Sequence, residues 1–163
     1  MEMGIRILSL PEPYLARVRE EGLDAQGQPV RRFVSAGGDP CRDALRRSRP
    51  GEEVILASYG PFEGARPNPY REFGPVFLLA KPETAPINRT ALPVTGDHPE
   101  RYFGDGPLAF RAYDAGGDII DGALGGTADA EAAVARFLGS PAVAHVDVRF
   151  AIRGCFACRV VRA

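Results

Sequence analysis

Short apolar runs that end at glycine or proline dominate this sequence, and they limit the folds that it can adopt. Residues 108–114 alternate apolar and polar side chains, a glycine pair follows, and residues 118–121 continue in the opposite direction. This pattern predicts a β-hairpin with a glycine turn. Residues 143–150 and 155–161 predict a second hairpin at the end of the sequence. Hairpins join antiparallel strands, so the sheet that they build is mostly antiparallel.

The other predicted elements do not alternate regularly between strand and helix. Residues 127–138 carry an apolar stripe at helical spacing, and shorter helices are indicated after Pro11 and at residues 41–47. Regular alternation would indicate a doubly wound parallel sheet, and its absence favours an α+β domain. We therefore expect a mostly antiparallel β-sheet packed with two or three short helices. Further strands are predicted at residues 5–10, 30–34, 53–59 and 75–80, the last of these central because it is almost continuously apolar.

The length of 163 residues fits one domain, spanning residues 1–163. Residues 81–107 have no sustained periodicity and are rich in proline and glycine. Connections of this length without their own structure are uncommon, and they are often lids, binding loops or disordered segments. We interpret residues 81–107 as a long irregular connection over the surface.

The charge and the motifs exclude several classes of function. The formal net charge is −1, so no footprint for nucleic acid or for an anionic membrane surface is present. No apolar run is long enough to serve as a signal peptide or to span a membrane, which predicts a cytoplasmic protein. No glycine-rich nucleotide fingerprint follows a strand, and no cofactor is expected. Every basic residue except Lys81 is an arginine, so a single arginine carries little weight as a functional signal.

The closing hairpin contains Cys155 and Cys158 in a C-x-x-C spacing. Residues three apart on a strand point to opposite faces, so the two thiols would diverge. A structural zinc site needs a second pair of ligands, and the sequence offers none, so no metal is expected. If Phe150 pairs with Cys155, then Cys155 lies on the apolar face and Cys158 lies beside Asp147 on the polar face.

Cys41 follows Asp39 and Pro40, a pair that is typical of a helix start. In the first turn of a helix and beside Arg42, its thiolate would be favoured, which makes Cys41 the candidate catalytic residue. The commoner role of a free cysteine is a small buried side chain. A nucleophile also needs a base, and His98 and His145 are the only histidines.

Several segments together resemble the bacterial family of domains of unknown function number 1203 (DUF1203). The resemblance spans nearly the whole chain and implies a compact bacterial cytosolic domain, but no reaction is assigned to the family. It is carried by residues 40–42 (PCR), 50–56 (PGEEVIL), Tyr59, 69–77 (PYREFGPVF), 108–121 (LAFRAYDAGGDIID) and 153–163 (RGCFACRVVRA). Cys158 departs from the family pattern. Besides Cys41, the resemblance selects as candidate ligand-binding residues Arg42, Tyr70, Arg71, Arg111, Tyr113, Asp114 and Cys155.

These residues support two classes of function. In the first, arginines clamp a small anionic ligand, tyrosines and Asp114 orient it, and a cysteine lies at the centre, with or without a reaction. In the second, the same residues are structural, and the domain is a homodimer or partner-binding module. The two classes of function predict different geometries. A ligand site is favoured if one pocket brings together Arg42, Arg71, Arg111 and Cys41. A structural role is favoured if these residues are dispersed as separate ion pairs.

Overall fold

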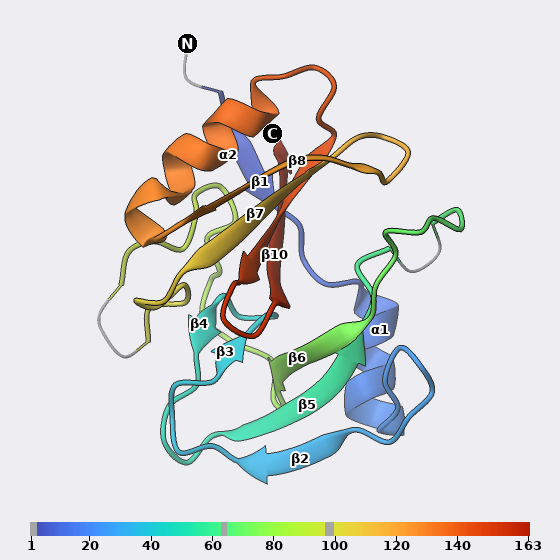
Figure 1. Cartoon of the computed structure of the whole chain (residues 1–163). Helices are drawn as coiled ribbons and strands as arrows, with labels where there is room; N and C mark the ends of the chain where they lie inside the picture. Colours follow the sequence, from blue (N-terminus) through green and yellow to red (C-terminus); the bar gives the residue numbers. More distant parts are fainter. Residues whose placement is uncertain (1–2, 63–64, 97–99) are drawn as a thin grey trace.

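The structure is a computed structural model that describes residues 3–62, 65–96 and 100–163, and two five-stranded sheets form its body (Figure 1). Sheet I contains both ends of the chain and the two predicted hairpins, and all its strands are antiparallel. In spatial order its strands are β1 (Ile5–Ile7), β10 (Cys155–Arg162), β9 (His145–Phe150), β7 (Leu108–Tyr113) and β8 (Ile119–Gly125).

Sheet II lies below sheet I in Figure 1. Its strands are antiparallel except at one place, where β3 pairs with β6 in parallel through Cys41 and Phe77. The β6 strand lies at the centre of this sheet, which confirms the prediction for this apolar segment. In spatial order the strands are β2 (Arg31–Val34), β5 (Glu53–Tyr59), β6 (Gly74–Leu79), β3 (Pro40–Cys41) and β4 (Arg46–Arg47).

Short helices cover one side of each sheet. The helix α1 (Glu12–Ala16) continues as one π-helical turn, η1 (Arg17–Glu21), and ends at Gly22, whose φ of 69° is the left-handed conformation that glycine adopts without strain. A 3₁₀ turn, η2 (Thr127–Asp129), leads into α2 (Ala130–Leu138), as the apolar stripe predicts. An α+β fold of short helices and mostly antiparallel sheet is therefore confirmed.

Each sheet has its own hydrophobic core. Under α2, the apolar face of sheet I buries Phe110, Val146 and Val148 against Phe137. Under α1, sheet II buries a second group that contains Tyr14, Leu15, Ile55, Leu78 and, from sheet I, Phe156. Charged side chains of β7, β9 and β10 lie on the face of sheet I opposite to α2. Two of them, Arg111 and Arg149, form ion pairs there with Glu72 of the β5–β6 connection.

Two sequence predictions concern irregular regions. The predicted helix at residues 41–47 is wrong: this segment is the β3–β4 hairpin, because the Arg42 amide donates to the carbonyl of Phe77 and ties the chain to β6. The connection at residues 81–107 contains no helix or strand in its described part, residues 81–96 and 100–107. Across the described residues, no helix has the length and apolarity to cross a membrane.

Candidate functional site

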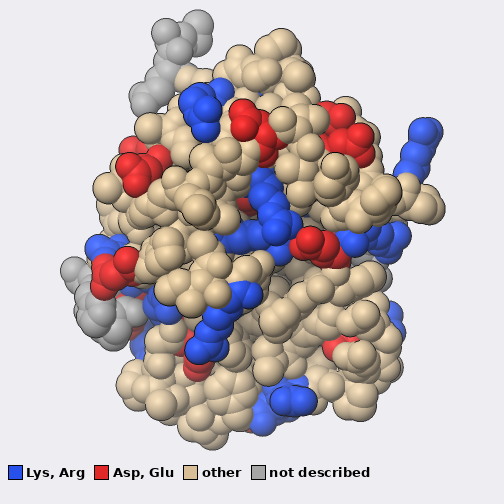
Figure 2. Space-filling view, viewed as in Figure 1, with Lys and Arg blue, Asp and Glu red and all other residues tan. Residues whose placement is uncertain are grey.

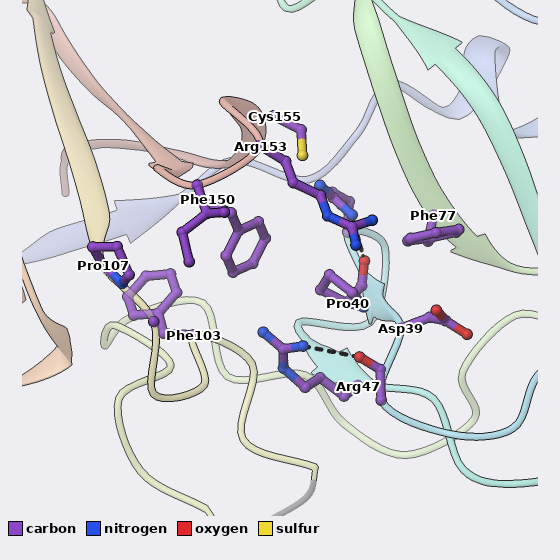
Figure 3. A pocket seen from close by; sticks show the side chains of 13 residues that line it. Asp39, Pro40, Arg47, Phe77, Phe103, Pro107, Phe150, Arg153 and Cys155 are labelled. Atoms are coloured by element: carbon purple, nitrogen blue, oxygen red, sulfur yellow. Dashed lines mark hydrogen bonds between the residues drawn. The ribbon is translucent and has the colours of Figure 1, made fainter.

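A cavity of about 460 Å³ opens where the tip of the β9–β10 hairpin meets β3, β4 and β6 (Figure 3). Three arginines line it: Arg42, Arg47 and Arg153. The rest of its wall is largely apolar. In Figure 3, Arg47 and Arg153 reach toward the cavity from opposite sides. The apolar lining comes from Pro40, Phe77, Phe103, Pro107, Phe150 and Ile152.

The register of the closing hairpin positions two lining residues. Phe150 pairs with Cys155, the register on which the sequence analysis made the position of Cys155 depend, so both side chains lie on one face of the hairpin. The four residues between them form the turn, and Gly154 at φ 75° closes it, with its amide donating to the carbonyl of Phe150. Arg153 therefore lies at the tip of the hairpin, directly above the cavity.

Arg42 is buried in the cavity wall with only 3% of the residue exposed. Its Nε donates to the carbonyl of Phe156 at 2.7 Å, and its Nη1 donates to the carbonyl of Pro40 at 2.7 Å. Its guanidinium lies over the ring of Phe150, 5.2 Å from the centroid. These partners orient the side chain, but neither carbonyl neutralises its charge.

Arg47 is held in the same way. Its Nη1 donates to the carbonyl of Gly38 at 2.9 Å, and its Nε donates to two further carbonyls, those of Arg101 and Tyr102. Burial lowers the pKa of Arg47, and the positive charge of Arg42 lowers it further. Among the described residues, no carboxylate forms an ion pair with Arg42, Arg47 or Arg153. The cavity thus holds net positive charge.

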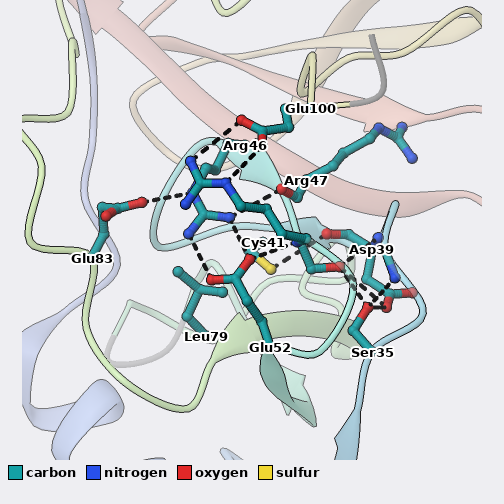
Figure 4. Close-up of polar contacts among 12 residues, drawn as sticks. Ser35, Asp39, Cys41, Arg46, Arg47, Glu52, Leu79, Glu83 and Glu100 are labelled. Carbon is teal, nitrogen blue, oxygen red and sulfur yellow. Dashed lines mark hydrogen bonds and ion pairs between the residues drawn. The ribbon is translucent and has the colours of Figure 1, made fainter. Parts of the chain in front are cut away.

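The neighbouring residue Arg46 shows the opposite arrangement (Figure 4). Its guanidinium contacts Glu52 at 2.8 Å and Glu83 at 2.6 Å. The hydrogen bonds from Arg46 hold the pKa of Glu52 at about 2, well below its usual value. Asp39 lines the cavity, but its carboxylate accepts hydrogen bonds from the hydroxyls of Ser35 and Ser48. The fold therefore pairs Arg46 with two carboxylates, whereas no carboxylate among the described residues forms an ion pair with the cavity arginines.

Cys41, the predicted catalytic residue, lies outside the cavity lining. It is fully buried, and its thiol donates to the carbonyl of Asp39 at 3.3 Å. Burial, with the negative charge of Asp43 nearby, raises the pKa of Cys41 to about 12. This environment is typical of a structural thiol rather than of a nucleophile. His98, one of the two histidines considered as a base, lies outside the described residues.

The predicted position of Cys158 on the polar face is wrong. The register shifts between Phe156 and Cys158, so a β-bulge places Cys158 opposite Val148 in the core of sheet I. Burial raises the pKa of the Cys158 thiol. Cys155, in contrast, is half-buried and lines the arginine cavity. No group of three or more His, Cys, Asp or Glu side chains suited to a metal ion occurs in the described parts of the chain.

The remaining predicted site residues lie elsewhere. Arg111 forms an ion pair with Glu72 at 3.2 Å on the polar face of sheet I, and Tyr113 is buried two residues further along β7. Asp114 accepts amide hydrogen bonds within its own turn. Tyr70 and Arg71 belong to the connection between β5 and β6, where the Arg71 guanidinium lies over the ring of Phe73.

The structure therefore does not bring Arg42, Arg71, Arg111 and Cys41 to one pocket, and by that criterion Arg71 and Arg111 favour structural roles. Figure 2 shows basic side chains gathered across the middle of the molecule, where sheet I lies above sheet II. Of the predicted residues, Arg42 and Cys155 share a cavity, and the sequence analysis missed Arg47, Phe150 and Arg153 beside them. The pairing of Phe150 with Cys155 was the one sequence signal from which the shared position of these two lining residues could have been predicted.

His145, on the polar face of sheet I, gives a pH-dependent prediction. Burial, with the positive charge of Arg159 nearby, lowers the pKa of His145 to about 4, although Asp147 and Asp114 act in the opposite direction. Below pH 6.5 the unfolded chain binds a proton that the folded chain does not, so stability is lost as the pH falls from 6.5 to 4.

We expect His145→Phe to remove part of this dependence while keeping a ring against Tyr113. Between pH 7 and pH 5, the free energy of unfolding should fall by about 1–2 kcal/mol more in the natural chain than in the variant. Urea unfolding at both pH values measures the difference. An equal fall in the two proteins would contradict the prediction.

Comparison with known proteins identifies a family but no activity. The model of a family described as "Protein of unknown function (DUF1203)" matches residues 38–162 of the 163-residue chain. The matched region contains all the residues that line the arginine cavity. No curated protein and no solved structure matches the chain.

Proposed function

The chain belongs to the DUF1203 family, and we propose that it binds a small organic anion in the cavity lined by Arg42, Arg47 and Arg153. The three free cysteines fit the reducing cytoplasm in which we place the protein.

One observation carries the proposal: a buried arginine, Arg42, and a partly buried one, Arg47, line one cavity, and only carbonyl groups accept their hydrogen bonds. Burying an unpaired charge is costly, and proteins normally pair buried charges with counterions. Arg46 has such counterions in Glu52 and Glu83, one residue away from Arg47. An anionic ligand in the cavity would be the counterion that Arg42 and Arg47 lack.

The cavity also indicates the shape of the ligand. Its volume of about 460 Å³ lies in the range of small-molecule sites, which are usually apolar with a few polar anchors. Phe77, Phe103 and Phe150 provide apolar walls around the arginines. A ligand with a phosphate or carboxylate on a flat apolar body matches this lining better than a bare inorganic anion.

Phenyl phosphate is a suitable probe because it combines both features. We expect isothermal titration to show saturable binding of phenyl phosphate, weaker binding of inorganic phosphate, and none of phenol. The exposed side chain of Arg153 can be changed without disturbing the core, and Arg153→Gln should weaken phenyl phosphate binding about fivefold.

Arg31→Gln is the matched control, because Arg31 is an exposed arginine on β2 that does not line the cavity. This control should bind phenyl phosphate as the natural chain does. The proposal fails if phenyl phosphate shows no saturable binding at millimolar concentration, or if the two variants weaken it equally.

The dispersal of Arg71 and Arg111 favours a second candidate, a partner-binding or homodimeric module. Its supporting observation is that the edge strands β2 and β8 expose apolar side chains, with Val34 70% and Leu124 77% accessible. Analytical ultracentrifugation separates the candidates. A monomer that binds phenyl phosphate supports the ligand site, and a stable dimer without phenyl phosphate binding supports the module.

A further inference from the structure

The three thiols differ in how a reagent could reach them. Cys41 is 0% exposed and Cys158 is 3% exposed, each within a hydrophobic core. Cys155 is half-buried, and it lines the arginine cavity. In Figure 3 its sulfur points into the same space as the guanidinium of Arg153. A reagent that enters the cavity therefore meets one thiol.

A second observation points to a ligand beside this thiol. Arg42 lines the same cavity with only 3% of the residue exposed, yet among the described residues no carboxylate forms an ion pair with its guanidinium. Burial of a guanidinium without a counterion favours an anion at that place independently of the cysteine. The thiol and the unpaired charge thus share a single cavity.

We propose that Cys155 is a site of reversible modification by small anionic disulfides, which the arginines hold against its sulfur. The inference rests on the proposed function, since the anion would dock as the ligand does. In the exchange, the Cys155 thiolate attacks one sulfur of the disulfide, after its proton has passed to solvent. A new S–S bond forms, the original S–S bond breaks, and the second half of the reagent leaves as a thiolate. The Cys155 sulfur is oxidised and the departing sulfur is reduced, so no further oxidant is needed.

The arginines would make this exchange selective. An anionic disulfide is concentrated in a positively charged cavity, whereas a neutral disulfide gains nothing from the charge. The neighbouring phenylalanines favour reagents with flat apolar bodies. Aromatic disulfides that carry carboxylates combine both features and fit this chemistry.

The test compares two reagents on the folded protein: 5,5′-dithiobis(2-nitrobenzoate), which is anionic, and 4,4′-dithiodipyridine, which is neutral. We expect one thiol per chain to react before unfolding and two more to react only in denaturant. Cys155→Ser should abolish the fast reaction. The ratio of the anionic to the neutral rate should fall about tenfold in Arg153→Gln and stay constant in the control Arg31→Gln.

The outcomes separate this inference from the proposed function. If phenyl phosphate binds the natural chain but no thiol reacts before unfolding, or the fast reaction persists in Cys155→Ser, the modification site is refuted and the ligand site stands. If Cys155 reacts, but the rate ratio is the same in both arginine variants, selection of anionic disulfides is refuted. If, in addition, phenyl phosphate does not bind the natural chain, the proposed ligand site is refuted as well.

Discussion

Asp147→Asn is expected to lower the free energy of unfolding by about 3 kcal/mol, because it removes one partner of a buried ion pair. Asp147 is 0% exposed at the centre of sheet I, and both of its oxygens accept from Arg159, at 2.7 and 2.8 Å. Asparagine keeps the size of the side chain but cannot accept both hydrogen bonds. It would leave the charge of Arg159 without a counterion against the ring of Phe62.

Urea unfolding measures this loss, and Asp121→Asn on β8 is the matched control because Asp121 is exposed. The control should change stability by less than about 0.5 kcal/mol. Replacing both partners, in Asp147→Leu with Arg159→Met, should recover at least half of the loss, because no charge remains unpaired. A single variant that loses less than about 1 kcal/mol would show that Asp147 does not stabilise the fold in this way.

The strands could be predicted because their signals are local. The β5 strand was predicted with its observed bounds, and β7, β9 and β10 within two residues, since alternating or continuous apolar runs depend only on neighbouring residues. The division into two sheets could not be predicted in the same way. It depends on which strands pair, and β1 pairs with β10 from the other end of the sequence.

Two predictions were wrong because strand pairing, which the local sequence pattern does not show, decides the structure at these places. Asp39 and Pro40 favour a helix start, yet the carboxylate of Asp39 accepts from Ser35 and Ser48 while the main chain pairs with β6. Tertiary pairing overrides the capping signal there. The bulge near Phe156 changes the face on which Cys158 lies, and nothing in the local pattern marks the extra residue.

Most of the residues that line the arginine cavity could not be predicted from the sequence, for a different reason. Almost every basic residue of this chain is arginine, so Arg46, Arg47 and Arg153 look alike in the sequence. They differ only in their partners: Arg46 has two carboxylates, and Arg47 has none among the described residues. That distinction depends on residues distant in the sequence, such as Glu83, and it becomes visible only in the folded chain.

Arg47→Gln should therefore have the largest effect on ligand binding among the single variants considered. Unlike Arg153, Arg47 is held rigidly by carbonyl groups of Gly38 and Tyr102, so its charge is already oriented before a ligand arrives. A hydrogen bond between the Arg47 guanidinium and an anionic ligand would contribute about 2 kcal/mol to the free energy of binding. We expect the dissociation constant for phenyl phosphate to rise about 30-fold.

Isothermal titration provides the measurement, and circular dichroism verifies that the variant is folded. Arg47→Lys is the informative companion, because lysine keeps the charge but cannot reproduce the fork of hydrogen bonds to the carbonyl groups. It should bind phenyl phosphate more weakly than the natural chain and more tightly than Arg47→Gln. If folded Arg47→Gln binds phenyl phosphate with the affinity of the natural chain, the unpaired charge at Arg47 does not serve ligand binding. The cavity would then be a by-product of packing the hairpin tip against sheet II.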